Sequence, residues 1–310
     1  MDPTAREQWQ SEVLDAILES FAASDVLASC LVFKGARVLS KRLRTPKREP
    51  LDIDTNLDRR FADAHPGRSA QREYLSREVA TALRTHFGQQ EPVRFELLDV
   101  RVEFNPRQDH PRGWNAFLVS VSVRDLTKSG VRGLPVLRID VAAPEVLDAN
   151  SVAPLSIGRR EVRAYTLPRF AGEKLRALLT SLPAYRRKLG RPGESVRAKD
   201  IYDLACIERE RPLSDRTFWN AAGQEFRTAS ASRYVDCAGL TTFEEDSDVT
   251  RATYETDTTI PKDVSFEEAW AVLRAIVLLM EDRGVIPFAF APPAANLGDR
   301  GIDETSSGAR

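Results

Sequence analysis

Two aspartates, Asp52 and Asp54, lie two positions apart in the apolar stretch LDIDTNL, which spans residues 51–57. In a β-strand, residues two apart point to the same face, so both carboxylates would project together while Ile53 turns into the core. Two like charges held this close repel each other unless a cation lies between them, and Mg²⁺ or Mn²⁺ suits an all-oxygen site. The spacing therefore indicates a divalent-metal site, although the same pattern alone is more common at turns and solvated strand edges.

A third carboxylate, Asp140, lies in the stretch LRIDVA. Its apolar residues alternate with Arg138 and Asp140, which share the opposite face of the expected strand. If this strand neighbours the first, three aspartates converge and could hold two divalent ions about 4 Å apart, an arrangement that activates an attacking hydroxyl and stabilises a leaving pyrophosphate. The simpler alternative is a surface carboxylate paired with a neighbouring cation.

Gly35 lies between a strand-like run, residues 31–34, and a helix-like run, ARVLSKRL. A glycine turn before a helix brings backbone N–H groups and the positive helix N-terminus to one place, where a triphosphate could bind. In that helix Val38 and Leu39 are expected to face inward and the basic residues outward. One glycine is a weak signal, but strand, glycine turn, helix and aspartate strand together form a far more specific pattern.

The elements that must position these residues follow from hydrophobic periodicity. Helices are expected at 6–22, 36–43 and 70–87, and strands at 31–35, 51–57, 93–104, 116–126, 134–142 and 161–167. From Leu167 onward the pattern turns helical, at 168–182, 197–210, 215–226 and 266–282. We therefore expect an α+β fold with a mixed sheet flanked by helices in residues 1–166, a helical domain in 167–291, and a disordered tail in 292–310.

Composition narrows the class of protein. The chain has 310 residues with 42% hydrophobic content and a net charge of −1, and no apolar run approaches the roughly 20 residues that span a bilayer. Its N-terminus lacks a signal-peptide pattern, and its three cysteines are sparse and far apart, which fits a cytoplasmic protein without membrane attachment. The unclustered histidines argue against a zinc site.

Charge is strongly segregated along the chain. One basic block comprises Lys34, Arg37, Lys41, Arg42, Arg44, Lys47 and Arg48, and another comprises Arg186, Arg187, Lys188, Arg191, Arg197 and Lys199. Such blocks could line a groove for phosphate or nucleic acid, but charge runs are more often plain solvated faces.

Two separated stretches resemble one known family. FKGARVLSKRL, then Arg48 four residues before Asp52, then LDIDTNLD, looks like the opening of the AbiEii/AbiGii-type nucleotidyltransferase toxins of type IV toxin–antitoxin systems, a branch of the DNA polymerase β-like nucleotidyltransferases. RFAGEKLRALL followed by RAKDIYDL is similar to the later motif of that family. The resemblance covers roughly residues 30–210, and the segment beyond Arg211 aligns with nothing known to us.

The resemblance implies a nucleotidyltransferase-like fold whose helical domain completes the active site. It implies metal binding by Asp52, Asp54 and Asp140, catalytic roles for these three together with Lys174 and Asp200, and nucleotide binding by Lys34, Gly35, Arg37, Arg48, Lys174 and Asp203. From the residues alone, Lys174 flanks the buried stripe of its helix, and a surface lysine stacked on the core is the alternative. If Lys174 meets the triphosphate, Lys174→Met should keep thermal stability and lose only nucleotide binding and transfer.

We therefore expect a Mg²⁺-dependent nucleotidyltransferase toxin of a toxin–antitoxin or phage-defence system. It would move a nucleotide from an NTP to an acceptor, expected to be tRNA, with a cognate antitoxin as a possible partner. Ala36 and Arg37 stand where the family has a second glycine and a hydroxyl residue. That departure motivates an alternative, a nucleotide-binding regulatory module with weakened transfer, although such a module would be expected to lose its aspartates. A metal-dependent nuclease is a third possibility, but it would not call for the glycine turn and Lys174.

Overall fold

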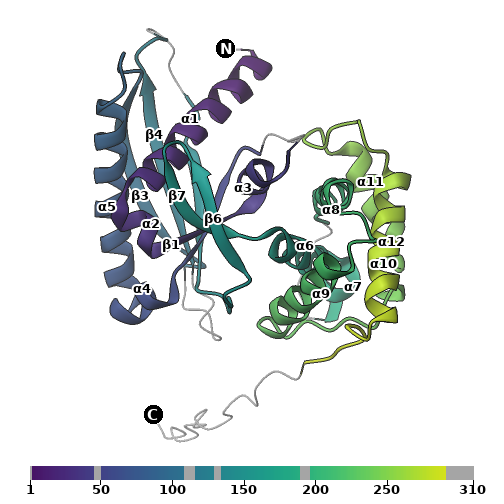
Figure 1. Cartoon of the computed structure of the whole chain (residues 1–310). Helices are drawn as coiled ribbons and strands as arrows, with labels where there is room; N and C mark the ends of the chain where they lie inside the picture. The colour runs from purple at the N-terminus through teal and green to yellow at the C-terminus, as the bar shows by residue number, and fades with distance from the viewer. Residues whose placement is uncertain (1, 45–49, 108–115, 129–133, 189–195, 291–310) are drawn as a thin grey trace, which may run out of the picture.

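The computed structural model describes residues 2–44, 50–107, 116–128, 134–188 and 196–290. Arg48, Lys47, Arg191 and the expected tail at 292–310 lie outside the described residues. The chain forms an α+β structure in which a sheet half, residues 2–166, lies beside a helical half, residues 167–290 (Figure 1). Most of the expected helices and strands are present, with ends that differ by a few residues.

Within the described residues, seven strands form one mixed sheet. They are β1 (Leu31–Lys34), β2 (Ile53–Leu57), β3 (Phe95–Asn105), β4 (Ala116–Asp125), β5 (Leu137–Ala142), β6 (Val152–Ile157) and β7 (Arg160–Tyr165), in the order β3-β4-β5-β2-β1-β7-β6. The β2–β5 and β1–β7 pairs are parallel, and the others are antiparallel. The sequence did not predict β6, an edge strand that contains Pro154, because proline weakens the strand signal and is tolerated only at edges.

Five helices accompany the sheet: α1 (Pro3–Ala23), α2 (Asp25–Cys30), α3 (Gly35–Arg42), α4 (Arg59–Ala64) and α5 (Arg68–Gly88). Alternation in β4 shows which face is buried, since Phe117, Val119, Val121 and Val123 are all at most 3% exposed while the residues between them are partly accessible. Helices α1 and α5 pack together, and α5 lies against β3 (Figure 1). Ile53 and Ile139 belong to the buried apolar set, so Asp54 and Asp140, their strand neighbours, face the other side.

The helical half comprises α6 (Leu167–Ser181), α7 (Pro183–Lys188), α8 (Lys199–Glu210), α9 (Arg216–Ala231), α10 (Thr241–Glu244), α11 (Ser247–Thr256) and α12 (Phe266–Asp282). Helix α6 contacts both α8 and α9, and α12 covers α8. No helix in the described ranges is long and apolar enough to cross a membrane.

Basic side chains of the first basic block make hydrogen bonds and ion pairs inside the protein. Arg42 donates to main-chain oxygens of β6 and β7, at Pro154 (2.8 Å), Ala153 (2.7 Å) and Tyr165 (3.0 Å). Arg37 is only 5% exposed, so the expectation that the basic residues of this helix face outward is wrong at this position. Helical periodicity predicted one buried face, but the guanidinium of Arg37 also contacts Asp15 and Ser11 of α1.

Helices α6 and α9 approach closely at Gly172. A Cβ atom at Gly172 would lie 2.5 Å from the backbone nitrogen of Phe226 and 2.7 Å from the carbonyl carbon of Glu225. Backbone atoms cannot rotate out of the way, so any larger residue must push the two helices apart.

Gly172→Ala should therefore lower the free energy of unfolding by about 1–3 kcal/mol, the usual cost of overpacking. Gly88→Ala is the matched control, because no atom lies within 4 Å of the added Cβ in the last turn of α5. We expect the control to be neutral or slightly stabilising, and urea unfolding of both variants measures the difference. Equal stability of the two variants would show that the helices separate freely.

Candidate active site

Asp54 occupies the centre of the candidate site. On β2 it lies directly opposite Lys34 of the antiparallel β1 and opposite Asp140 of the parallel β5. Residues in register on neighbouring strands point to the same face, with their Cβ atoms about 5 Å apart. The fold thus sets one lysine and two carboxylates side by side, from three segments that are distant in the sequence.

Burial and like charge raise the pKa of two of these aspartates. Burial has the largest effect on Asp54, followed by the charge of Asp52, and its pKa rises although Lys34 and two cations of the helical half act to lower it. The pKa of Asp140 is raised by burial and then by the charges of Asp54 and Asp52. A bound cation would offset this repulsion.

The three aspartates belong to one site, but their side chains are not arranged as a complete set of metal ligands. In the described part of the chain, no group of three or more His, Cys, Asp and Glu side chains is arranged to hold a metal ion. The register places Asp54 next to Asp140, and metal binding by the three aspartates stays a prediction. Carboxylates without a cation between them repel each other and are more stable apart. An all-carboxylate donor set still fits Mg²⁺ or Mn²⁺ after side-chain rotation.

Gly35 allows α3 to begin directly against Asp54. Its φ is +81°, and a Cβ atom at this position would lie 2.1 Å from Oδ2 of Asp54. The carboxylate therefore occupies the space beside the N-terminus of α3, where the helix dipole favours negative charge. The sequence predicted that this turn binds phosphate. In the structure the absence of a side chain at Gly35 also leaves room for the carboxylate of Asp54.

The later motif supplies cations to the same site. Nζ of Lys174 lies 2.8 Å from Oδ1 of Asp200 and 2.5 Å from Oδ2 of Asp203, while Nε of Arg197 lies 2.7 Å from Oδ2 of Asp200. Burial alone would raise the pKa of Asp200, but Arg197 and Lys174 hold it well below its usual range. Both cations also lower the pKa of Asp54, so the helical half balances charge in the sheet half.

Lys174 is a buried member of this ion-pair cluster, with a side chain that is 8% exposed. The prediction that Lys174→Met keeps thermal stability is therefore wrong in physical terms, because methionine would leave two buried carboxylates without their shared cation. Its predicted contact with the triphosphate stays a prediction. The sequence revealed the spacing of Asp200 and Asp203 but not that both carboxylates point at one lysine.

The structure brings Arg37 to a different place from the expected phosphate contact. Its guanidinium pairs with Asp15 (3.0 Å), donates to the backbone oxygen of Ser11 (3.3 Å), and donates to the backbone oxygen of Pro50. These contacts tie α3 to α1 and to the start of the aspartate strand. We therefore correct its role from nucleotide binding to packing.

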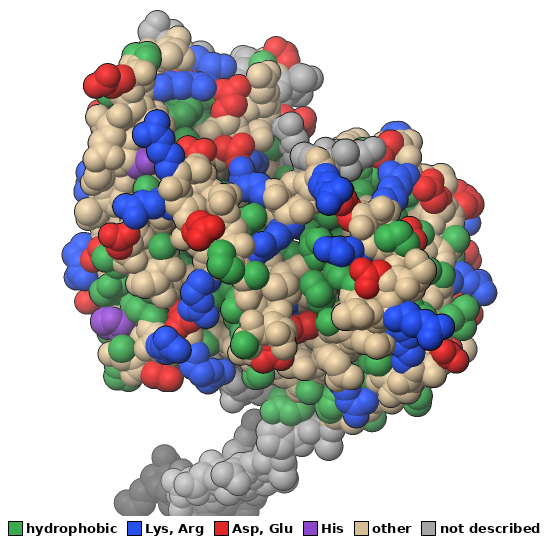
Figure 2. Space-filling view, in the orientation of Figure 1, with side chains coloured by type: hydrophobic (Ala, Val, Ile, Leu, Met, Phe, Trp, Pro, Cys, Tyr) green, Lys and Arg blue, Asp and Glu red, His purple; other side chains and the backbone are tan. Residues whose placement is uncertain are grey.

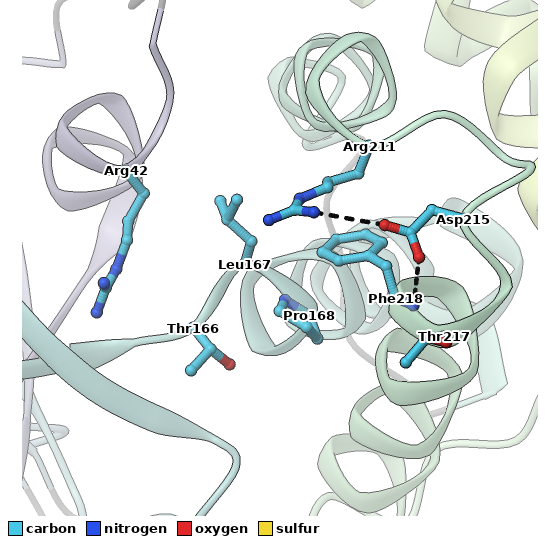
Figure 3. A pocket seen from close by; sticks show the side chains of 8 residues that line it. All are labelled: Arg42, Thr166, Leu167, Pro168, Arg211, Asp215, Thr217 and Phe218. Atoms are coloured by element: carbon cyan, nitrogen blue, oxygen red, sulfur yellow. Dashed lines mark hydrogen bonds and ion pairs between the residues drawn. The ribbon is translucent and has the colours of Figure 1, made fainter.

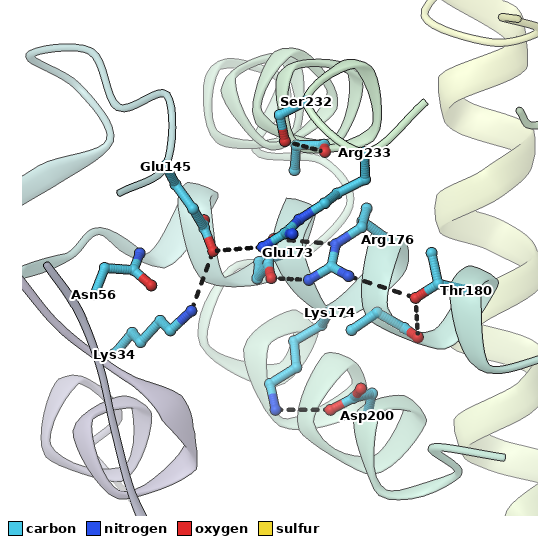
Figure 4. Close-up of polar contacts among 12 residues, drawn as sticks. Lys34, Asn56, Glu145, Glu173, Lys174, Arg176, Thr180, Asp200, Ser232 and Arg233 are labelled. Atoms are coloured by element: carbon cyan, nitrogen blue, oxygen red, sulfur yellow. Dashed lines mark hydrogen bonds and ion pairs between the residues drawn. The ribbon is translucent and has the colours of Figure 1, made fainter. Parts of the chain in front are cut away.

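Glu145 is a site residue that sequence reasoning missed. It follows β5, and its carboxylate accepts from Nζ of Lys34 (3.1 Å), the hydroxyl of Tyr165 (2.7 Å) and Nη2 of Arg169 (2.7 Å). Burial alone would raise its pKa, but Lys34 and Arg169 hold the pKa of Glu145 well below its usual range. Figure 4 shows Glu145 between Lys34 and the cationic side chains of the helical half. No periodic pattern marks this loop, so only its distance of five residues from Asp140 could have drawn attention.

A cavity of about 590 Å³ lies elsewhere between the two halves (Figure 3). It is lined by Arg42, Thr166, Leu167, Pro168, Arg211, Asp215, Thr217 and Phe218. Arg211 pairs with Asp215 across its edge at 3.4 Å. None of the three predicted metal-binding aspartates lines this cavity.

Gly35→Ala tests the seating of Asp54. We expect it to destabilise the protein and abolish any activity of the site, because the added methyl group displaces the Asp54 carboxylate. Gly67→Ala is a matched control, since Gly67 also has a positive φ of +94° but nothing lies within 4 Å of its added Cβ. Both variants carry backbone strain of about 1–3 kcal/mol, so a larger loss of thermal stability in Gly35→Ala isolates the contact with Asp54.

Lys174→Met should lower the free energy of unfolding by about 3–5 kcal/mol, the usual cost of leaving buried charges unpaired. Lys174→Met combined with Asp203→Asn should recover part of this loss, because one uncompensated carboxylate is removed. Lys262→Met, at an exposed lysine, is the control and should change stability by less than about 0.5 kcal/mol. Denaturant unfolding measures all three, and wild-type stability of Lys174→Met would contradict the ion-pair assignment.

Comparisons with known proteins identify the family. The model of the family described as "Nucleotidyl transferase AbiEii toxin, Type IV TA system" matches residues 16–282. Curated proteins give no match. Among solved structures, an antigenic nucleotidyltransferase-like protein from Paracoccidioides brasiliensis is 12% identical with a TM-score of 0.30, covering 73% of this chain and 97% of that one. The solution structure of the antibiotic-resistance factor ANT(2'')-Ia is 14% identical with a TM-score of 0.28, covering 79% and 93%. The TM-scores of these two structures are too low to support an argument. The family model spans most of the chain, and this protein therefore belongs to the AbiEii family of nucleotidyltransferase toxins of type IV toxin–antitoxin systems.

Proposed function

We propose that the protein transfers a nucleotide from an NTP to a hydroxyl group of an RNA acceptor, with tRNA as the favoured class, using Mg²⁺ or Mn²⁺. The acceptor hydroxyl attacks the α-phosphorus, a new P–O bond forms, the bond between the α-phosphorus and the bridging oxygen breaks, and pyrophosphate leaves. The bound cation would stabilise the charge that develops on the phosphate oxygens. The register that sets Asp54 opposite Asp140 supports this proposal most directly.

Each residue of the site has a task in this scheme. Asp52, Asp54 and Asp140 would hold the cation, and a carboxylate beside it would accept the proton of the acceptor hydroxyl, with Asp140 as the candidate. Lys34 and Lys174 add positive charge near the aspartates, which favours a triphosphate. In this scheme Asp200 and Asp203 fix the ammonium of Lys174 at the edge of the site.

The helical half offers the better surface for the acceptor. In the first basic block, Arg37 and Arg42 are committed to internal contacts, whereas Arg187 of the second block has a side chain that is 70% exposed. Figure 2 shows basic and acidic side chains interspersed over the face in view, without one continuous basic stripe. We infer that the RNA backbone contacts a limited basic area near α7 and α8. The family also implies a cognate antitoxin as partner.

One observation favours the alternative of a binding module with weakened transfer. Arg37 stands where the family has a hydroxyl residue, so a hydrogen bond from that hydroxyl to a phosphate would be missing here. The packing role of Arg37 weakens this point, because the arginine is explained without any change in catalysis.

Transfer is tested with purified protein, Mg²⁺ or Mn²⁺, each α-labelled NTP in turn, and total tRNA. We expect label on RNA of increased length, and a loss of at least roughly 100-fold in Asp54→Asn, since a metal ligand contributes several kcal/mol to such reactions. Asp63→Asn, at an exposed aspartate of α4, is the control and should transfer at the wild-type rate.

Three outcomes separate the candidate functions. Shortened RNA would indicate a nuclease. Nucleotide binding without transfer under any NTP would support the binding module. Wild-type transfer by Asp54→Asn would contradict the assignment of the aspartate site.

A further inference from the structure

Glu145 is fixed from several sides at the boundary between the two halves. Its Oε1 accepts from Lys34, and its Oε2 accepts from both Tyr165 and Arg169. Arg169 is 1% exposed and also pairs with Glu225 of α9 at 2.9 Å. The side chain of Glu145 is itself only 7% exposed, so its carboxylate has little freedom to move.

Lys34 has two sets of carboxylates within reach. Its ammonium is bound to Glu145 at 3.1 Å, yet its register partner on β2 is Asp54. Side chains directly opposite each other in an antiparallel pair start about 5 Å apart at Cβ, so a lysine can reach across to an aspartate. The register places Lys34 beside Asp54, and Asp140 lies on the next strand beyond Asp54.

We propose that Glu145 is a positioning residue that holds the ammonium of Lys34 aside from Asp54, and so keeps the aspartates open to a divalent cation. The proposal rests on the metal requirement in the proposed function. Without Glu145 the flexible lysine would turn to its register partner Asp54, for which no ion pair is found among the described residues. An ammonium bound there competes with a metal ion for the same oxygens.

The arrangement also explains why Glu145 makes so many contacts. A single lysine–glutamate pair would exchange readily with a lysine–aspartate pair of similar energy. Tyr165 and Arg169 hold the carboxylate of Glu145 in place. The position of Glu145 therefore determines where the ammonium of Lys34 lies. Since Arg169 comes from α6, its pair with Glu145 also joins the sheet half to the helical half at this point.

The test measures Mn²⁺ binding by electron paramagnetic resonance, with no nucleotide and no acceptor present. Glu145→Gln should weaken Mn²⁺ affinity by roughly fivefold or more, the scale of coupling between groups in contact. Glu225→Gln is the matched control, since it removes the other buried carboxylate on Arg169 but does not touch Lys34. We expect the control to lose comparable stability and to keep wild-type Mn²⁺ affinity.

A double-mutant cycle separates positioning from long-range charge. If Glu145 acts through Lys34, then Glu145→Gln should change Mn²⁺ affinity little in a Lys34→Met background. If only the lost negative charge matters, the effect should be equal in both backgrounds, and the proposal is overturned. Wild-type affinity in Glu145→Gln overturns it as well.

Tyr165→Phe serves if Glu145→Gln does not fold. It removes one of the donors to Glu145 and should weaken Mn²⁺ binding in the same direction by a smaller factor, whereas unchanged affinity in this variant would then count against the proposal. Failure of the wild-type protein to bind Mn²⁺ would instead contradict the metal requirement in the proposed function.

Discussion

The structure depends on one unfavourable interaction, the repulsion between carboxylates that strand register forces together. Because β2 and β5 are parallel neighbours, Asp54 and Asp140 cannot separate by more than their side chains allow. Burial strengthens this repulsion by removing water that would screen it. The surrounding features supply positive charge: Lys34 on β1, the N-terminus of α3 at Gly35, and Lys174 and Arg197 from the helical half.

This division of charge makes the two halves interdependent. Two cations of the helical half, Lys174 and Arg197, act to lower the pKa of Asp54 while they remain paired with carboxylates of their own half. Arg169 links them, since it lies between Glu145 of the sheet half and Glu225 of α9. Buried ion pairs contribute little net stability compared with apolar packing, but they are strongly penalised when misaligned. We infer that this cluster specifies how the halves dock, while the apolar core around α6 supplies the stability.

Periodic patterns in the sequence predicted the elements that carry the site. Alternation in LDIDTNL and LRIDVA gave the shared face of Asp54 and Asp140, and helical spacing placed Lys174 beside a buried stripe. The pairing of β2 with β5 was only a condition of that prediction, because register between distant strands is decided by the whole sheet. The short helices α2 and α4 were not predicted, since a few residues carry too little periodic signal.

Partners of individual side chains were the least predictable feature. Arg37 was expected at the phosphates because of its place in the motif, but α1 covers it, and that contact lies outside any local pattern. Glu145 stands in an irregular loop, so its role became visible only when three elements converged on it. The clustering of basic residues along the chain was likewise a poor guide to a binding surface. Arg42, for example, donates its hydrogen bonds to backbone oxygens of β6 and β7. A run of basic residues in the sequence therefore need not form a binding surface. Only those basic side chains that are not engaged in internal hydrogen bonds or ion pairs can bind an RNA backbone.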